Sequence, residues 1–117
     1  TGHNAGGWEH LAEHLKVLRQ YCGQIYMIVG MVNDKDISGV LSMLPKNATY
    51  YFTKASVKRA LSEKELQSLA MQSRLHGDAY PDVETAVAAA KEKANKNDFI
   101  FVGGSSFIVA DLLKFHV

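Results

Sequence analysis

The chain has 117 residues, of which 47% are hydrophobic and 21% charged, and these values are typical of one folded domain rather than a disordered segment. With 13 basic and 12 acidic residues the net charge is +1, so the sequence lacks the positive excess that attracts nucleic acids or anionic membranes. The single cysteine, Cys22, excludes an intramolecular disulfide, and no apolar run reaches the roughly 18 residues of a membrane span. We therefore expect a soluble cytoplasmic protein with no nucleic-acid and no membrane partner.

The first half of the chain alternates helical and extended patterns. Apolar side chains recur at helical spacing from Trp8 onward, and this pattern ends near Gly23. The continuous apolar run at 24–32 (QIYMIVGMV) indicates a strand buried on both faces. Asp36 is placed to cap a short helix, and residues 48–53 (ATYYFT) are the next predicted strand.

A capping box marks the next helix. Ser62 and Glu65 have the S-x-x-E spacing in which each residue satisfies a free backbone N–H of the other. The helix that they open is predicted to continue to about His76, with Gly77 as its C-terminal stop. A minor strand is expected at 78–80.

The last third repeats the alternation. An Ala-rich helix is predicted to begin at Pro81 or Asp82, with Asp82 the better cap, and to end near Asn95. Residues 98–102 (DFIFV) form a third buried strand, and 103–106 (GGSS) turn into a final helix.

These alternating elements predict an α/β fold, because apolar strands separated by helices form parallel sheets covered on both faces. We expect a Rossmann-like three-layer domain with a mostly parallel sheet that occupies residues 1–117. The chain opens with loop residues at 1–4 directly before a helix. We therefore expect further sequence upstream of Thr1.

Open α/β sheets bind ligands beyond the carboxyl ends of their strands, where helix N-termini offer free N–H groups to anions. Three predicted segments, 2–4, 33–36 and 103–106, occupy such positions. A Gly-Gly-Ser turn is more often structural than functional, and a lone loop histidine is more often incidental. The pattern alone predicts only a domain that binds a small ligand.

A metal site is not supported by the sequence. His10, Glu13 and His14 match the H-x-x-E-H pattern of some zinc proteases, but no third ligand is evident and these residues lie largely opposite the apolar helix face. We interpret them as a solvated helix face. Cys22 has no motif that would activate it.

At the three strand-end segments the sequence resembles the folylpolyglutamate synthases of the Mur ligase superfamily. Gly2-His3-Asn4 matches the middle of the family's D-x-x-H-N-P motif, with Ala5 in place of the proline. The similarity spans almost the whole chain in the right order. Its other elements are GMVNDKDI at 30–37, Arg59-Ala60 of a P-R-A motif, the helix with Val83, Ala86 and Ala90, and Gly104-Ser105 with Phe107 in the closing G-S-x-Y/F turn.

The resemblance implies the C-terminal domain of an ATP-dependent ligase that adds L-glutamate to folates, with dihydrofolate synthase activity left open. ATP would phosphorylate a carboxylate of the folate or dihydropteroate, and glutamate would attack the acyl phosphate. ATP and Mg²⁺ would be held mainly by an N-terminal ATP- and folate-binding domain outside this sequence. We accordingly expect no tightly bound cofactor or metal in this chain, no ligase activity from it alone, and a monomer.

The family's functional residues map onto two of these loops. His3 would be catalytic, near the γ-phosphate and the incoming glutamate, and Ser105 at the Gly104 turn would hydrogen-bond the glutamate carboxylate. Phe107 lacks the hydroxyl of the tyrosine that the family often has there. Four residues would shape the loops: Asn4, Asp34, Lys35 and Asp36.

Two alternatives stay open. Another Mur-type ligase would add an amino acid to a cell-wall precursor, and it would differ in its choice of amino acid and acceptor. A non-enzymatic α/β module would bind a small anion or nucleotide without any second domain. An upstream phosphate-binding loop favours a ligase, whereas a start codon next to Thr1 favours the module.

Overall fold

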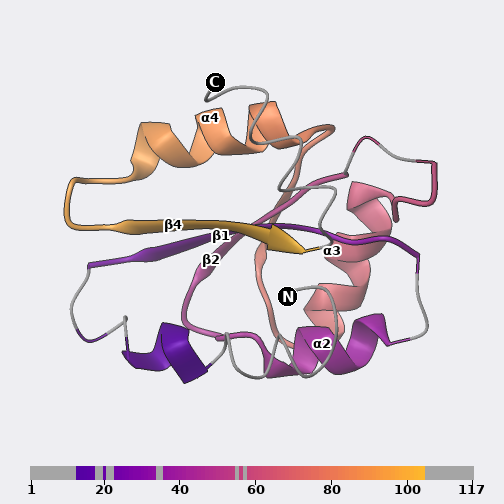
Figure 1. Ribbon diagram of the computed structural model, residues 1–117, viewed down its shortest axis with the longest axis horizontal. Helices are drawn as coiled ribbons and strands as arrows, with labels where there is room; N and C mark the ends of the chain where they lie inside the picture. Colours follow the sequence, from indigo (N-terminus) through magenta and orange to yellow (C-terminus); the bar gives the residue numbers. More distant parts are fainter. Residues whose placement is uncertain are drawn as a thin grey trace.

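The four strands form one parallel sheet, as the sequence predicted, and their order in the structure is β3-β2-β1-β4 (Figure 1). The strands are β1 (Ile25–Gly30), β2 (Thr49–Phe52), β3 (Gly77–Ala79) and β4 (Phe99–Gly104). This computed structural model describes residues 13–17, 20, 23–33, 36–54, 56 and 58–104. The predicted final helix, the start of the chain and Cys22 lie outside the described residues.

Helices cover both faces of the sheet and complete the predicted three layers. A helical segment at 13–17 packs through Leu15 on the same face as α2 and α3, and α4 packs on the opposite face (Figure 1). None of the helices in the described part of the chain is long and apolar enough to cross a membrane. The bounds are α2 (Ile37–Met43), α3 (Glu63–Gln72) and α4 (Val83–Lys93).

The strand β1 is the centre of both cores. All six of its residues are buried, because neighbouring strands pair with both of its edges and helices cover both of its faces. Met27 and Val29 join the core beneath α2 and α3, whereas Tyr26 and Ile28 join the core beneath α4. The continuous apolar run in the sequence therefore reflects burial on both sides.

Two helix starts follow the predicted caps, and a third differs. The Ser62 side chain accepts a hydrogen bond from the Glu65 backbone N–H at 3.1 Å, and the Asp82 side chain accepts one from Thr85 N–H at 2.7 Å. Asp36 occupies the N-cap position of α2, but its carboxylate makes no cap hydrogen bond. Its backbone (φ −109°, ψ 25°) is not in the extended conformation that directs a cap side chain toward the helix N–H groups.

The prediction that Gly77 ends α3 was wrong. The helix ends at Gln72, four residues before the predicted end at His76, and Arg74 rather than a glycine takes the left-handed conformation, with φ of 64°. Gly77 is instead the first residue of β3, one residue earlier than the predicted strand. A Cβ at this position would overlap the Tyr50 carbonyl group, so the missing side chain allows β3 to approach β2.

Tyr50 joins the sheet to the loop that precedes β2. Its ring is buried and stacks on Phe52 with centroids 5.7 Å apart, and its hydroxyl donates a hydrogen bond of 2.6 Å to the Pro45 carbonyl. Burial raises the pKa of this hydroxyl above its ordinary value. The phenol is therefore neutral in the folded chain at any physiological pH.

We predict that Gly77→Ala destabilises the fold by about 2 kcal/mol or more, because the new methyl group must displace the β2 backbone. Chemical denaturation of the wild type and the variant measures this change in the free energy of unfolding. Asp78→Ala, at an exposed position of the same strand, is the matched control and should change stability by less than about 0.5 kcal/mol. Equal stability of both variants would contradict the close approach of β3 and β2.

We also predict an alkaline loss of stability. Because the pKa of Tyr50 is raised in the folded chain, its contribution is fully present below the unfolded pKa of about 10 and is lost as the pH rises above that value. Denaturation at several pH values from 8 to 11 should show this decline, and Tyr50→Phe should make it shallower. An identical decline in the variant would assign the effect to other groups.

Candidate functional site

The carboxyl ends of three strands meet at one edge of the sheet, marked by the arrowhead of β4 in Figure 1. Gly30, the last residue of β1, pairs with Gly104, the last residue of β4. On the other side of β1, Val29 pairs with Phe52, so the chain leaves β2 beside Gly30. Neighbouring strands lie about 4.8 Å apart, and the segments that follow β1, β2 and β4 therefore begin within reach of one small ligand.

The structure describes only some of the predicted site residues. Gly104 lies at this edge, and Asp36 precedes α2, the helix that follows the exit of β1. The remaining predicted residues lie outside the described part of the chain, and their roles stay predictions. They are His3, Asn4, Asp34, Lys35 and Ser105.

The chain that follows β2 folds back along the extension of β1. The Asn33 backbone N–H donates to the Arg59 carbonyl at 2.8 Å, the Leu61 N–H donates to the Met31 carbonyl at 2.8 Å, and Val32 forms an antiparallel bridge with Ala60. We call residues 53–61 the return segment. It brings the Arg59-Ala60 motif next to the loop after β1.

The return segment carries three exposed cations, Lys54, Lys58 and Arg59. The chain as a whole is almost neutral, so this concentration of positive charge within one segment is not revealed by the net charge. Cations close to free strand ends attract carboxylates and phosphates. The basic residues of KASVKRA (54–60) are visible in the sequence. Their location near the strand ends depends on pairing between residues far apart in the chain, which the sequence does not show.

Asp36 contacts its own helix without capping it. Its carboxylate lies over the first turn of α2, where a Cβ on Gly39 would collide with the carboxylate. Glycine at 39 therefore makes room for Asp36. The loop-shaping role expected for Asp36 stays a prediction.

The predicted Gly103-Gly104 turn is the end of strand β4, because β1 continues to pair with both residues. A Cβ on Gly103 would meet the ring of Phe101, so this glycine accommodates an aromatic side chain of its own strand. The predicted turn at these two glycines was therefore wrong, and the site role expected for Gly104 stays a prediction.

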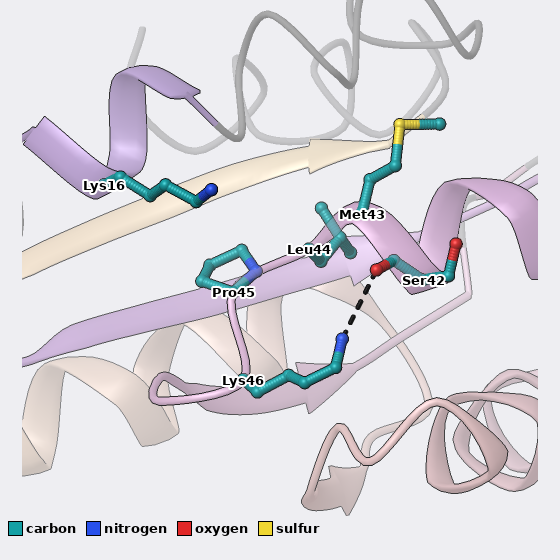
Figure 2. Close-up of a pocket in the computed structure, with 6 residues that line it drawn as sticks. All are labelled: Lys16, Ser42, Met43, Leu44, Pro45 and Lys46. Carbon is teal, nitrogen blue, oxygen red and sulfur yellow. Dashed lines mark hydrogen bonds between the residues drawn. The ribbon is translucent and has the colours of Figure 1, made fainter.

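A pocket of about 300 Å³ lies at the opposite edge, where α2 ends and the chain approaches β2 (Figure 2). The Lys46 ammonium donates a hydrogen bond of 3.3 Å to the Ser42 carbonyl, and Lys16 is 3.8 Å from the Glu13 carboxylate. Both cations thus have partners within the chain. Because α/β sheets bind substrates at the carboxyl ends of their strands, we do not assign catalysis to this pocket. Its lining residues are Lys16, Ser42, Met43, Leu44, Pro45 and Lys46.

No group of three His, Cys, Asp or Glu side chains within the described ranges could hold a metal ion. Glu13 and His14 of the H-x-x-E-H pattern are exposed on the helical segment 13–17, and His10 lies outside the described residues. The exposure of these two side chains agrees with a solvated helix face.

Known proteins and a family model match this chain over all four strands of the sheet. The family model described as "Mur ligase, glutamate ligase domain" matches residues 1–106. The dihydrofolate synthase/folylpolyglutamate synthase of Buchnera aphidicola subsp. Schizaphis graminum is 29% identical over 116 residues, which cover 97% of this chain and 27% of that protein. The chain thus spans about a quarter of the length of this relative.

Two solved structures have the same fold at similar identity. Escherichia coli FolC in complex with DHPP and ADP superposes with a TM-score of 0.86 at 27% identity, over 97% of this chain and 27% of that chain. A bifunctional folylpolyglutamate synthase/dihydrofolate synthase with Mn, AMPPNP and L-glutamate bound has a TM-score of 0.76 at 26% identity, over 98% of this chain and 27% of that chain.

Proposed function

The chain belongs to the Mur ligase glutamate ligase domain family, and from this membership we propose that it forms the glutamate-binding side of an ATP-dependent folate–glutamate ligase. One observation carries the proposal. The family match spans the strand ends that the sheet brings together. A second, supporting observation is that the return segment beside these ends carries three exposed cations. The relatives named above, a dihydrofolate synthase/folylpolyglutamate synthase and an enzyme with L-glutamate bound, support the same activity.

The proposed reaction places several anions next to one another. ATP transfers its γ-phosphoryl group to a substrate carboxylate, the amine of glutamate attacks the carbonyl carbon of the resulting acyl phosphate, and phosphate leaves as the amine loses a proton. Catalysis therefore requires positioning of the reactants and stabilisation of the negative charge that accumulates. Lys54, Lys58 and Arg59 suit the second task, because they are exposed at the edge where the strands end.

Individual roles follow the family resemblance. His3 acts near the γ-phosphate and glutamate, and Ser105 at the Gly104 turn binds the glutamate carboxylate. We assign most contacts to ATP, Mg²⁺ and the folate or dihydropteroate to an N-terminal domain that works with this chain. Mg²⁺ would there offset phosphate charge. The enzyme would act as a monomer in the cytoplasm.

Phosphate release by the complete enzyme tests the proposal. The assay contains ATP and Mg²⁺, with glutamate plus either a reduced folate or dihydropteroate. Release that requires glutamate and the reduced folate supports folylpolyglutamate synthase activity, and release with dihydropteroate adds dihydrofolate synthase activity. No release with either acceptor would contradict the proposal and favour another Mur-type ligase or a binding module. The 117-residue chain alone should release none.

We predict that His3→Ala and Ser105→Ala in the complete enzyme each lower kcat/KM for glutamate by about 10- to 100-fold, the usual effect of losing a hydrogen bond to a charged group. Steady-state kinetics with varied glutamate measure the change. His14→Ala and Ser68→Ala replace the same residue types at exposed helical positions and serve as controls. If the site variants and these controls have the same kcat/KM, the assignment of His3 and Ser105 to the site is contradicted.

We also predict that Arg59→Gln raises the KM for an anionic substrate by about 3- to 10-fold, and that this difference shrinks at high salt because the ions screen an exposed charge. Lys91→Gln removes an exposed cation at the end of α4, near the opposite edge of the sheet, and should leave KM unchanged. A salt-independent effect, or an equal effect of both variants, would argue against an anion-binding return segment.

A further inference from the structure

Apart from tyrosines, Thr53, the first residue of the return segment, is the one buried polar side chain among the described residues, with 0% of its surface exposed. Its hydroxyl oxygen has no hydrogen-bond partner. Buried hydroxyl groups are almost always paired, because burial removes their hydrogen bonds to water. An unpaired one at a candidate active edge requires an explanation.

The position of Thr53 is set by the sheet. Its backbone N–H donates to the Val29 carbonyl at 2.9 Å, which continues the β1–β2 ladder by one residue and places Thr53 beside Gly30. Gly30 pairs with Gly104. On the side of β2 that faces away from β1, the Tyr80 N–H donates to the Phe52 carbonyl at 2.7 Å. Tyr80 is the residue that follows β3. Thr53 thus lies in a row with the two glycines that end β1 and β4.

Thr53 is also the anchor of the cationic segment. The return segment is fixed to β1 at its start by the Thr53 N–H and at its end by the Val32–Ala60 bridge. Lys54 and Lys58 lie between these two anchors and are exposed. A change in how the Thr53 side chain is bonded would therefore change how these cations are held.

Stability alone favours valine at this position. Valine has nearly the shape of threonine and no hydroxyl to leave unpaired, and replacing an unsatisfied polar group by an apolar group of the same shape is neutral or stabilising. The unpaired hydroxyl thus costs stability in this conformation. Buried polar groups that lack a partner in one conformation are expected where function uses a second conformation.

We propose that Thr53 is a positioning residue whose hydroxyl gains its hydrogen-bond partner, a backbone group of the return segment, when anionic substrates draw the segment's cations over the strand ends. Ser and Thr hydroxyls readily bond the backbone a few residues along the chain. Because the hydroxyl is fully buried, it acts through the segment and does not touch the substrate. This inference rests on the proposed ligase function.

The first part of the test compares Thr53→Val, Thr53→Ser and the wild type in the complete enzyme without substrates. Thr53→Val should raise the midpoint of thermal unfolding by about 2–5 °C, since it removes the unpaired hydroxyl. Thr49→Val, at an exposed position at the other end of β2, is the matched control and should leave the midpoint within about 1 °C. A lower midpoint for Thr53→Val would show that the hydroxyl is already bonded, and would overturn the inference.

The second part measures glutamate kinetics on the same proteins. Thr53→Val should lower kcat/KM for glutamate by about 10-fold, chiefly through a higher KM, while Thr53→Ser, which keeps the hydroxyl, stays within about 3-fold of the wild type. Wild-type kinetics in Thr53→Val, or an equal loss in Thr53→Ser, would overturn the positioning role. An inactive wild type would instead refute the proposed function, and this inference with it.

Discussion

The parallel pairing of β1 with β2 on one side and β4 on the other determines where everything else lies. Because all three strands run in the same direction, their carboxyl ends reach the same edge, and Gly30, Gly104 and the exit of β2 fall within a few residues of one another in register. Burial of β1 on both faces makes this arrangement costly to change, since a shift in register would also displace the two cores.

The positive charge at this edge results from the route that the chain takes after β2, and not from an excess of basic residues in the sequence. Hydrogen bonds from Asn33 and to Met31 hold the return segment against β1, and they carry Lys54, Lys58 and Arg59 to the strand ends. The same path buries Thr53 at the base of the segment. The exposed cations and the residue that we propose positions them thus belong to one connection, the chain between β2 and α3. The pocket near Lys46 lies at the opposite edge and belongs to neither.

Features encoded within a few residues were predictable from the sequence. The apolar run of β1 and the caps at Ser62 and Asp82 are local patterns, and the structure has them where they were expected. Gly77 was misassigned because the space that it needs is set by Tyr50 on the neighbouring strand, and Gly103 was misassigned because pairing with β1 extends β4 beyond the apolar run. The return segment was missed because its bridge to Val32 is a contact between distant residues.

Sequence resemblance supplied most of the named residues of the candidate site, whereas the described structure shows that β1, β2 and β4 end at one edge of the sheet and that a segment with exposed cations begins there. Hydrogen exchange of the complete enzyme, with and without glutamate plus a non-hydrolysable ATP analogue, tests directly whether substrates bind there. We predict slower exchange of backbone amides at 30–36 and 53–61, and unchanged exchange at 42–48 and 94–98 on the opposite edge. Protection confined to 42–48, the segment that lines most of the pocket, would contradict it.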